Sequence, residues 1–306
     1  MAYEWEAPES ASGLYVNING ETVPAEKATV SVFDRCVLYG DAVFDSFPVY
    51  DGRVVLLDRH IDRLYRSAKA VKIDLPESKD EIKRRVVETL EAGGVENGSV
   101  RVIVTRGAGP TGLVNTDQLE EPTILVLTSR RLEETFSKDE VTTSKARLAA
   151  TRTIPPDSLD RKVKTTNYLG NALAERELVG TDADFSIMLN HDGTVAEAYA
   201  ANVFVRDHTG TFRTPPVKNV LGGLTRAVVI ETARRLGYEV EEAEMTQYDL
   251  YTAEDLFLTS SGLGISFVEE LDGQVIGDGE PSDELLDLAE SFFEYVNTEE
   301  YVELDV

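Results

Sequence analysis

The chain has 306 residues, of which 42% are hydrophobic and 8% aromatic, which is enough apolar material for a sizeable core in one large or two medium domains. It carries 30 Lys and Arg against 56 Asp and Glu, a formal net charge of −26. Such a charge repels nucleic-acid phosphates and anionic lipid heads. No apolar stretch reaches the roughly 18 residues of a membrane span. We therefore expect neither nucleic acid nor a membrane as partner.

The acidic residues are spread along the whole chain rather than gathered in one tail. This spread favours adaptation to high salt, where screening shortens the range of self-repulsion, over a merely acidic protein. The single cysteine, Cys36, excludes an intrachain disulfide and favours a reducing, cytoplasmic setting. Its apolar neighbours indicate a small core residue rather than a nucleophile.

The first half of the chain mixes hairpins and amphipathic helices. Asn19-Gly20 joins two short strands within residues 14–23, and Asp51-Gly52 joins strands at 42–50 and 53–57. Apolar spacing predicts helices at 58–71 and 78–92, and strands are expected at 100–105 and 123–128. Residues 129–140 are charged and lack an apolar period. We expect a small N-terminal domain at 1–130, a linker at 131–139 and a large C-terminal domain at 140–306 that ends in an acidic tail from Asn297.

The second half also mixes strands and helices without strict βαβ alternation. Strands are expected at 141–150, 185–190, 203–206 and 256–259, and helices at 167–178, 224–236 and 283–295. The pattern therefore predicts α+β or barrel-like domains rather than a doubly wound sheet.

One glycine motif has to be set aside. Gly107-Ala-Gly-Pro-Thr-Gly112 matches G-x-G-x-x-G and follows a strand. A dinucleotide site also needs a helix that opens within the glycines and an acidic residue about 20 residues later. Pro110 interrupts the motif, and the next strand ends in Thr128-Ser-Arg-Arg. A surface loop, or a loop that closes over a substrate, fits these residues better.

Lys164 is the candidate catalytic residue. It precedes an apolar helix start, and Tyr168 lies one helical turn later, so the two side chains can share a face. A lysine in a partly apolar pocket loses its proton more readily and can form a Schiff base. Lys162 competes with it, because in an extended segment both lysines point to the same side.

Three other pieces suit a phosphorylated cofactor, although each alone has an ordinary structural explanation. Gly222-Gly223 opens the helix at 224, and exposed N–H groups at a helix start bind phosphate. Arg63 could clamp that phosphate, or could be a surface arginine on an amphipathic helix. Glu197 could hold the protonated nitrogen of a pyridine ring, or could be a loop glutamate.

Taken together, the chain resembles the fold-type-four family of pyridoxal-phosphate enzymes from about Tyr15 to Gly279. The marks of the resemblance are Tyr39-Gly-Asp41 with Phe44, His60-Ile-Asp-Arg63-Leu-Tyr, Lys164-Thr-Thr-Asn-Tyr-Leu, Glu197 with Asn202-Val-Phe, Gly223-Leu-Thr-Arg226 and Leu256-Phe-Leu-Thr-Ser-Ser261. Their order and spacing match the family, so the joint signal is far more specific than any single motif.

The resemblance implies roles for these residues. Lys164 would bind pyridoxal 5'-phosphate covalently and carry a proton, and Glu197 would pair with the ring nitrogen. The remaining cofactor contacts would come from Arg63, Tyr168, the N–H groups of Leu224 and Thr225, and Ser261. The substrate would face Tyr39, Phe44, Arg101 and Gly262. The resemblance further implies a small N-terminal and a larger barrel-like C-terminal domain with the cofactor between them, a homodimer, and no metal.

The choice among family members stays open at this level. Arg101 looks like the arginine that branched-chain aminotransferases use for the distal carboxylate of glutamate. Those enzymes usually read Phe-Glu-Gly-Ile-Arg where this chain has Phe44-Asp-Ser-Phe-Pro48. We expect transfer of an amino group between a branched-chain L-amino acid and a 2-oxo acid such as 2-oxoglutarate. The alternatives are an (R)-amine or D-amino-acid transaminase, an aminodeoxychorismate lyase, and an inactive relative that binds the cofactor or a partner.

Overall fold

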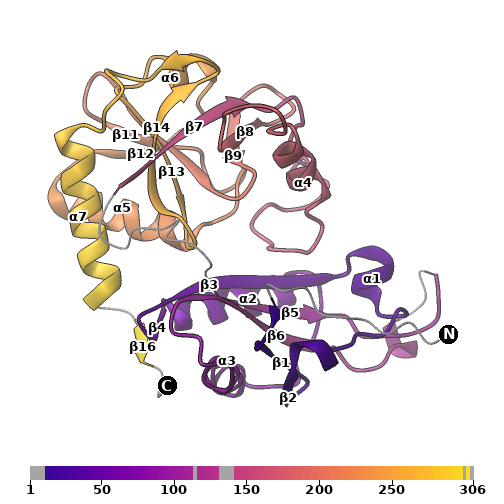
Figure 1. The fold of residues 1–306 in the computed structure, drawn as a ribbon. Helices are drawn as coiled ribbons and strands as arrows, with labels where there is room; N and C mark the ends of the chain where they lie inside the picture. Colours follow the sequence, from indigo (N-terminus) through magenta and orange to yellow (C-terminus); the bar gives the residue numbers. More distant parts are fainter. Residues whose placement is uncertain (1–10, 113–115, 131–140, 299–300, 304–306) are drawn as a thin grey trace. The chain divides into compact units, whose positions relative to one another are not determined.

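The computed structural model describes residues 11–112, 116–130, 141–298 and 301–303 (Figure 1). The chain forms two compact units. The first unit contains Met1–Glu134, Val163–Asn167 and Glu299–Val306, and the second contains Thr135–Lys162 and Tyr168–Thr298. The expected linker at 131–139 lies outside the described residues, so the domain boundaries stay a prediction. The segment that carries Lys164 belongs to the first unit, although the residues on either side of it belong to the second.

The first unit is built on a seven-stranded antiparallel sheet with the order β16-β4-β3-β5-β6-β1-β2. Its strands are β1 (Tyr15–Ile18), β2 (Glu21–Pro24), β3 (Ala42–Tyr50), β4 (Arg53–Val55), β5 (Gly98–Thr105), β6 (Ile124–Arg130) and β16 (Tyr301–Glu303). Its helices are α1 (Arg35–Tyr39), α2 (Leu57–Ala70) and α3 (Lys79–Gly93). Both predicted hairpins are confirmed, because Asn19, Gly20, Asp51 and Gly52 all adopt positive φ at the turns. Strand β16 falls within the segment expected as an acidic tail and pairs with β4.

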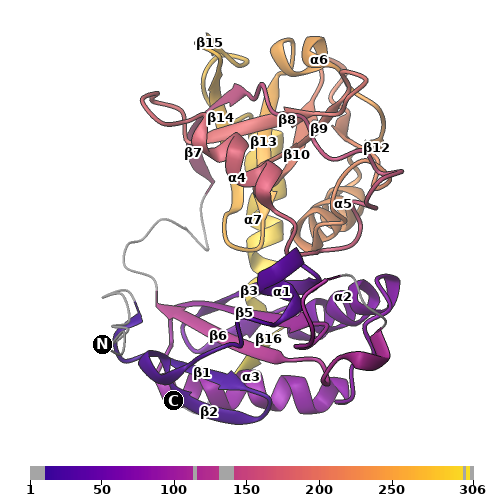
Figure 2. The same ribbon diagram turned by 90° about the vertical axis from the view of Figure 1, so that its right-hand side faces the viewer.

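Helices α2 and α3 cover one face of this sheet (Figure 2). Their buried apolar side chains, among them Ile61, Leu64 and Val86, form one core with alternate residues of β3, β5 and β6. On β3 this alternation sends Val43 and Phe47 toward the helices. Phe44 and Ser46, which alternate with them, therefore lie on the opposite face of the sheet.

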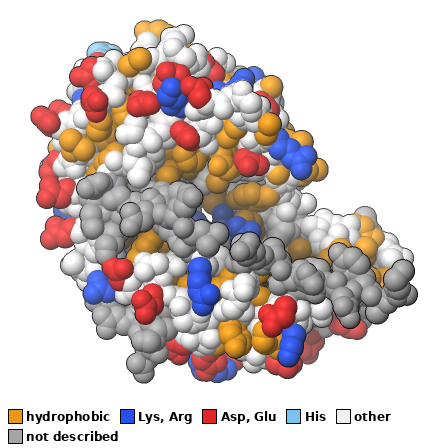
Figure 3. Space-filling view, viewed as in Figure 1, with side chains coloured by type: hydrophobic (Ala, Val, Ile, Leu, Met, Phe, Trp, Pro, Cys, Tyr) orange, Lys and Arg blue, Asp and Glu red, His pale blue; other side chains and the backbone are white. Residues whose placement is uncertain are grey.

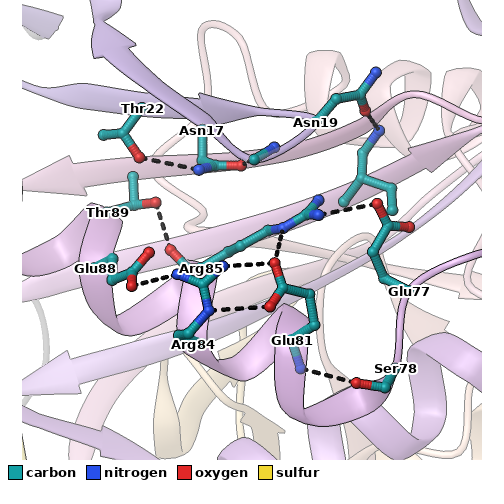
Figure 4. A network of polar contacts seen from close by, with 12 residues as sticks. Asn17, Asn19, Thr22, Glu77, Ser78, Glu81, Arg84, Arg85, Glu88 and Thr89 are labelled. Carbon is teal, nitrogen blue, oxygen red and sulfur yellow. Dashed lines mark hydrogen bonds and ion pairs between the residues drawn. The ribbon is translucent and has the colours of Figure 1, made fainter.

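Polar contacts attach the start of α3 (Figure 4). The Ser78 hydroxyl accepts the N–H of Glu81 at 3.2 Å and caps the helix, as its position in the sequence predicts. Arg85 is buried and donates to Glu77 at 3.0 Å and to Glu81 at 2.9 Å. Its guanidinium lies beside Gly20 in the β1–β2 turn, so this network brings α3 against that hairpin.

The second unit is built on a nine-stranded mixed sheet. A path of eight strands has the order β12-β11-β10-β13-β14-β7-β8-β9, β15 pairs with β14, and β9 also pairs with β10. The strands are β7 (Thr142–Leu148), β8 (Phe185–Leu189), β9 (Val195–Ala198), β10 (Asn202–Arg206), β11 (Phe212–Thr214), β12 (Val240–Glu242), β13 (Asp255–Ser260), β14 (Gly264–Leu271) and β15 (Gln274–Val275). The β9–β10 pairing closes the strand order on itself, as in a barrel. Parallel and antiparallel pairs occur together, so the expected α+β class is confirmed.

The helices of the second unit are α4 (Leu169–Arg176), α5 (Leu224–Leu236), α6 (Gln247–Tyr251) and α7 (Asp283–Thr298). Helices α5 and α7 pack together, and α5 also contacts β13. Helix α4 was expected at 167–178 and is shorter at both ends, with Tyr168 as its N-terminal cap residue. No helix within the described ranges is long and apolar enough to cross a membrane. Acidic side chains are dispersed over both units on the face shown in Figure 3.

Candidate active site

Residues 163–166 run beside the first half of β3. The Lys164 carbonyl accepts the Phe44 N–H at 2.9 Å, and the Thr166 N–H donates to the Ala42 carbonyl at 3.0 Å. Thr165 forms an antiparallel bridge with Val43. The Lys164 N–H donates to the Ser67 hydroxyl of α2 at 3.2 Å. The backbone of Lys164 is therefore held by both a strand and a helix.

The structure separates the two competing lysines. The Lys164 side chain is half-buried, and its Nζ lies 4.6 Å from the centroid of the Phe44 ring. The Lys162 side chain is 57% exposed and forms an ion pair with Asp160 at 3.3 Å. An amine beside an aromatic ring in a half-buried setting is better placed for covalent chemistry than an amine in water. The geometry thus favours Lys164.

Phe44 also brings Arg101 close to the lysine. The Arg101 guanidinium carbon lies 4.8 Å from the Phe44 ring centroid, and its Nε–H donates to the Ser46 hydroxyl at 2.9 Å. Ser46 and Arg101 are direct partners in the β3–β5 register, so their side chains share the sheet face that the helices leave open. Lys164, Phe44 and Arg101 therefore form one cluster, with an exposed cation at its edge.

On the helix side of β3, Asp45 holds Arg63. The guanidinium donates through Nε and Nη2 to the two Asp45 oxygens, both at 2.8 Å, and the Nδ1–H of His60 donates to the same carboxylate at 2.7 Å. All three side chains are buried. Burial alone would raise the pKa of Asp45, but the charge of Arg63 holds it well below its usual range. Burial lowers the pKa of His60, against the opposite effect of the Asp45 charge, and so favours the neutral imidazole.

This arrangement refines the role of Arg63. Asp45 neutralises the guanidinium charge, so Arg63 would offer a phosphate its N–H groups rather than a net positive charge. The sequence gives only a weak indication that His60 and Arg63 share a partner, namely their three-residue spacing on one face of α2.

Tyr39 and the glycine-rich loop contact each other. The Gly112 N–H donates to the Tyr39 hydroxyl at 2.6 Å, and Arg35 stacks over the Tyr39 ring and donates to the Gly112 carbonyl. A side chain at Gly107 would clash with the Glu120 carbonyl. Close backbone packing therefore explains this glycine without a dinucleotide.

In the second unit, Glu197 of β9 is buried and bound by two donors. One is the guanidinium of Arg161, and the other is the N–H of Leu221, at 2.9 Å from Glu197 Oε2. Asn202, the register partner of Glu197, donates to the carbonyl of the same Leu221 at 3.0 Å. Glu197 and Asn202 thus bind the N–H and the carbonyl of Leu221, which lies directly before the turn at the start of α5.

That turn requires glycine. A side chain at Gly223 would clash with Asn202 Oδ1. Gly223 is the N-cap of α5, no described side chain caps the helix there, and its first turn has no acidic residue. The N–H groups of Leu224 and Thr225 therefore stand at a helix start that suits an anion.

The remaining predicted residues lie at element ends of the second unit. Ser261 and Gly262 form the turn between β13 and β14, and Gly262 is exposed. Tyr168 is half-buried at the start of α4. Arg161 was not predicted, because its partner Glu197 lies 36 residues away and no local pattern joins them.

The residues fit pyridoxal phosphate. A half-buried lysine beside an aromatic ring suits the aldehyde, an uncapped helix start suits the phosphate, and a buried carboxylate suits a protonated ring nitrogen. Among the described residues, no group of three or more His, Cys, Asp and Glu side chains could hold a metal ion.

Comparisons with known proteins agree with this chemistry. Residues 42–271 match the family model for amino-transferase class IV. The chain is 38% identical over 280 residues to a Methanocaldococcus jannaschii protein that is provisionally named a branched-chain-amino-acid aminotransferase, which covers 91% of this chain and 95% of that one. It is 30% identical to a D-alanine aminotransferase of Listeria monocytogenes, over 87% of this chain and 90% of that one. It is also 30% identical to an aminodeoxychorismate lyase of Bacillus subtilis, over 82% and 84%.

The fold has a close counterpart of known structure. The branched-chain amino acid aminotransferase of T.th., in complex with N-(5'-phosphopyridoxyl)-L-glutamate, superimposes with a TM-score of 0.85. The match covers 93% of this chain and 94% of that one at 28% identity. Together with the family model and the relatives, it shows that this chain belongs to the class IV aminotransferases and is a pyridoxal-phosphate-dependent enzyme.

Proposed function

We propose that the enzyme transfers an amino group between a branched-chain L-amino acid and a 2-oxo acid such as 2-oxoglutarate. The observation that carries this proposal is Arg101, an exposed cation held by Ser46 beside Phe44, whose ring also contacts the Lys164 side chain. A dicarboxylic 2-oxo acid needs a cation for its second carboxylate, and an apolar ring suits a branched aliphatic side chain. The similarity to the Methanocaldococcus jannaschii protein supports the same substrate class.

Lys164 and the residues predicted to contact the cofactor have separate tasks in this reaction. Lys164 would hold the cofactor covalently and would move the proton of the substrate α-carbon. Glu197 would accept a hydrogen bond from the ring nitrogen, and Tyr168 would contact the phenolic oxygen. The phosphate would be held by Arg63, the N–H groups of Leu224 and Thr225, and the Ser261 hydroxyl. When bound, the cofactor supplies the electron sink that makes removal of the α-proton feasible.

A second candidate is an (R)-amine or D-amino-acid transaminase. Pro48 stands where branched-chain enzymes usually carry an arginine, and it lies on the open side of β3 together with Phe44 and Ser46. A proline offers no charge to a substrate carboxylate. A panel of L-leucine, L-valine, D-alanine, (R)-1-phenylethylamine and aminodeoxychorismate separates these candidates and the lyase.

Lys164→Ala should abolish covalent attachment of the cofactor and lower turnover by more than about a hundredfold, because general acid–base catalysis alone contributes at least that factor. Borohydride reduction followed by peptide mapping measures the attachment site. Lys162→Ala is the matched control, since that lysine is exposed and paired with Asp160. An adduct on Lys162, or on neither lysine, would contradict the assignment.

Arg101→Ala should raise the KM for 2-oxoglutarate roughly ten- to a hundredfold, because a hydrogen bond to a charged group contributes about 1.5–3 kcal/mol. The KM for L-leucine should change little, since its side chain carries no charge. Arg66→Ala, which removes an exposed arginine of α2, is the control. Equal losses for both substrates would argue against a role in binding the distal carboxylate.

We further propose a homodimer. Val32, Phe33 and Val37 are 68%, 53% and 60% exposed within six residues of chain. Three neighbouring apolar side chains are unfavourable in water, and they contrast with the acidic character of a chain of net charge −26. A second copy of the chain would bury them.

Val37→Asp should shift the protein from dimer to monomer in sedimentation velocity at micromolar concentration, because burial would then include an unpaired carboxylate. Val179→Asp is the control, since Val179 is 83% exposed and lies in the second unit. A variant that sediments like the unmodified protein would exclude this patch from the interface.

The acidic surface supports adaptation to high salt. The melting temperature should rise by several degrees between about 0.1 M and 2 M KCl, because the screening length falls from about 10 Å to less than 3 Å. Screening also weakens exposed ion pairs such as Arg84 with Glu88, so the two effects have opposite signs. Differential scanning calorimetry gives the net sign, and a melting temperature that falls or stays constant would refute the adaptation.

A further inference from the structure

The side chain of Arg161 reaches Glu197 although the two residues are far apart in the sequence. Arg161 lies in the loop before residues 163–166, and Glu197 lies on β9. Nη2 of Arg161 contacts Oε1 of Glu197, and the two side chains are only 10% and 7% exposed. A buried contact between a guanidinium and a carboxylate is a charge-assisted hydrogen bond of the stronger kind.

The second oxygen of Glu197 is fixed separately. Oε2 accepts the Leu221 N–H at 2.9 Å, and Asn202 holds the Leu221 carbonyl. Two donors from different segments thus determine the orientation of the carboxylate. Each carboxylate oxygen can accept more than one hydrogen bond, so the pair leaves acceptor capacity for a further N–H donor.

Among the described residues, one carboxylate compensates the positive charge of Arg161. Throughout the described part of the chain, Glu197 is the acidic residue within ion-pair distance of Arg161, and Arg161 Nε is buried without a hydrogen-bond partner. Removing one member of a buried ion pair leaves an uncompensated charge, so the two residues must act as a unit.

We propose that Arg161 is a positioning residue that orients Glu197 toward the cofactor's ring nitrogen and compensates its charge. The inference rests on the role proposed above for Glu197. Arg161 needs no contact with substrate or cofactor in this scheme, because its whole effect passes through the carboxylate.

A double-mutant cycle tests this dependence. The four proteins are the unmodified enzyme, Arg161→Met, Glu197→Gln and the double variant, each as holoenzyme. Two quantities are measured for each: the rate of the single-turnover half-reaction with a saturating amino donor from the panel above, followed by cofactor absorbance, and the dissociation constant of pyridoxal phosphate from titration of the apoenzyme.

Arg161→Met should slow the half-reaction about tenfold or more in the unmodified background and change it less than about twofold in the Glu197→Gln background. The affinity for the cofactor should follow the same pattern. Arg161→Lys, which keeps a positive charge, should recover part of the rate. A residue with a merely structural role would lower the rate by the same factor in both backgrounds.

Three results would overturn the inference: equal factors in both backgrounds, no effect of Arg161→Met in the unmodified enzyme, or no recovery by Arg161→Lys. Should Arg161→Met fail to fold, as judged by its melting temperature, the cycle is run with Arg161→Lys and Arg161→Gln, and the same outcomes decide. Failure of the proposed function looks different, because the borohydride adduct at Lys164 would then be missing from the unmodified enzyme.

Discussion

Backbone pairing between residues 163–166 and β3 fixes the place of Lys164 before any side chain is considered. Strand β4 pairs with β3 at Val49 and Tyr50, so the edge of residues 42–44 is left to residues 163–166. Strand β5 pairs with the other edge of β3 from Ala42 to Val49. Because β3 is paired at both edges, it has little freedom to move. The Lys164 backbone is bound to it, so the position of the lysine amine varies mainly with the side-chain rotamers.

The side chains of β3 alternate between its two faces, so the strand contributes to two different clusters. Phe44 points to the open face, where Arg101 and the lysine amine contact its ring, while Asp45 points to the helices and holds Arg63. A register shift of one residue would exchange the ring and the carboxylate. The apolar neighbours Val43 and Phe47 oppose such a shift, because they would leave the core. Core packing therefore also fixes which polar groups of β3 face the helices and which face the open side.

Sequence patterns predicted the parts of this molecule that depend on local periodicity. Helices α2, α3 and α5 lie within one residue of their expected ranges, because apolar spacing and caps such as Ser78 are local signals. The five-residue helix α1 and the strands β9, β11, β12, β14 and β15 were not predicted. They are short, or they depend on pairing with distant strands, and neither property leaves a mark on a window of sequence.

In the candidate site, too, local motifs were predicted and long-range contacts were not. Motif spacing indicated Lys164 and Glu197, but not the partners that hold them. Ser67 reaches the Lys164 backbone from α2, and Arg161 reaches Glu197 across 36 residues. Such contacts follow from tertiary packing, which a single sequence does not encode in any fixed spacing.

Charge compensation distinguishes Arg63 and Arg161 from Arg101. Arg63 is buried and Arg161 is largely so, and each is neutralised by a carboxylate, Asp45 and Glu197 respectively. Arg101 is exposed and has no ion-pair partner among the described residues, and its contacts are a hydroxyl and a ring. A buried cation without a partner would cost more than folding could offset, so the buried arginines can orient neighbouring groups but add little net field. An exposed cation keeps its charge at small cost. In the proposed function, recognition of an anionic substrate would therefore fall to exposed Arg101, while the pairs of Arg63 with Asp45 and Arg161 with Glu197 orient their neighbours.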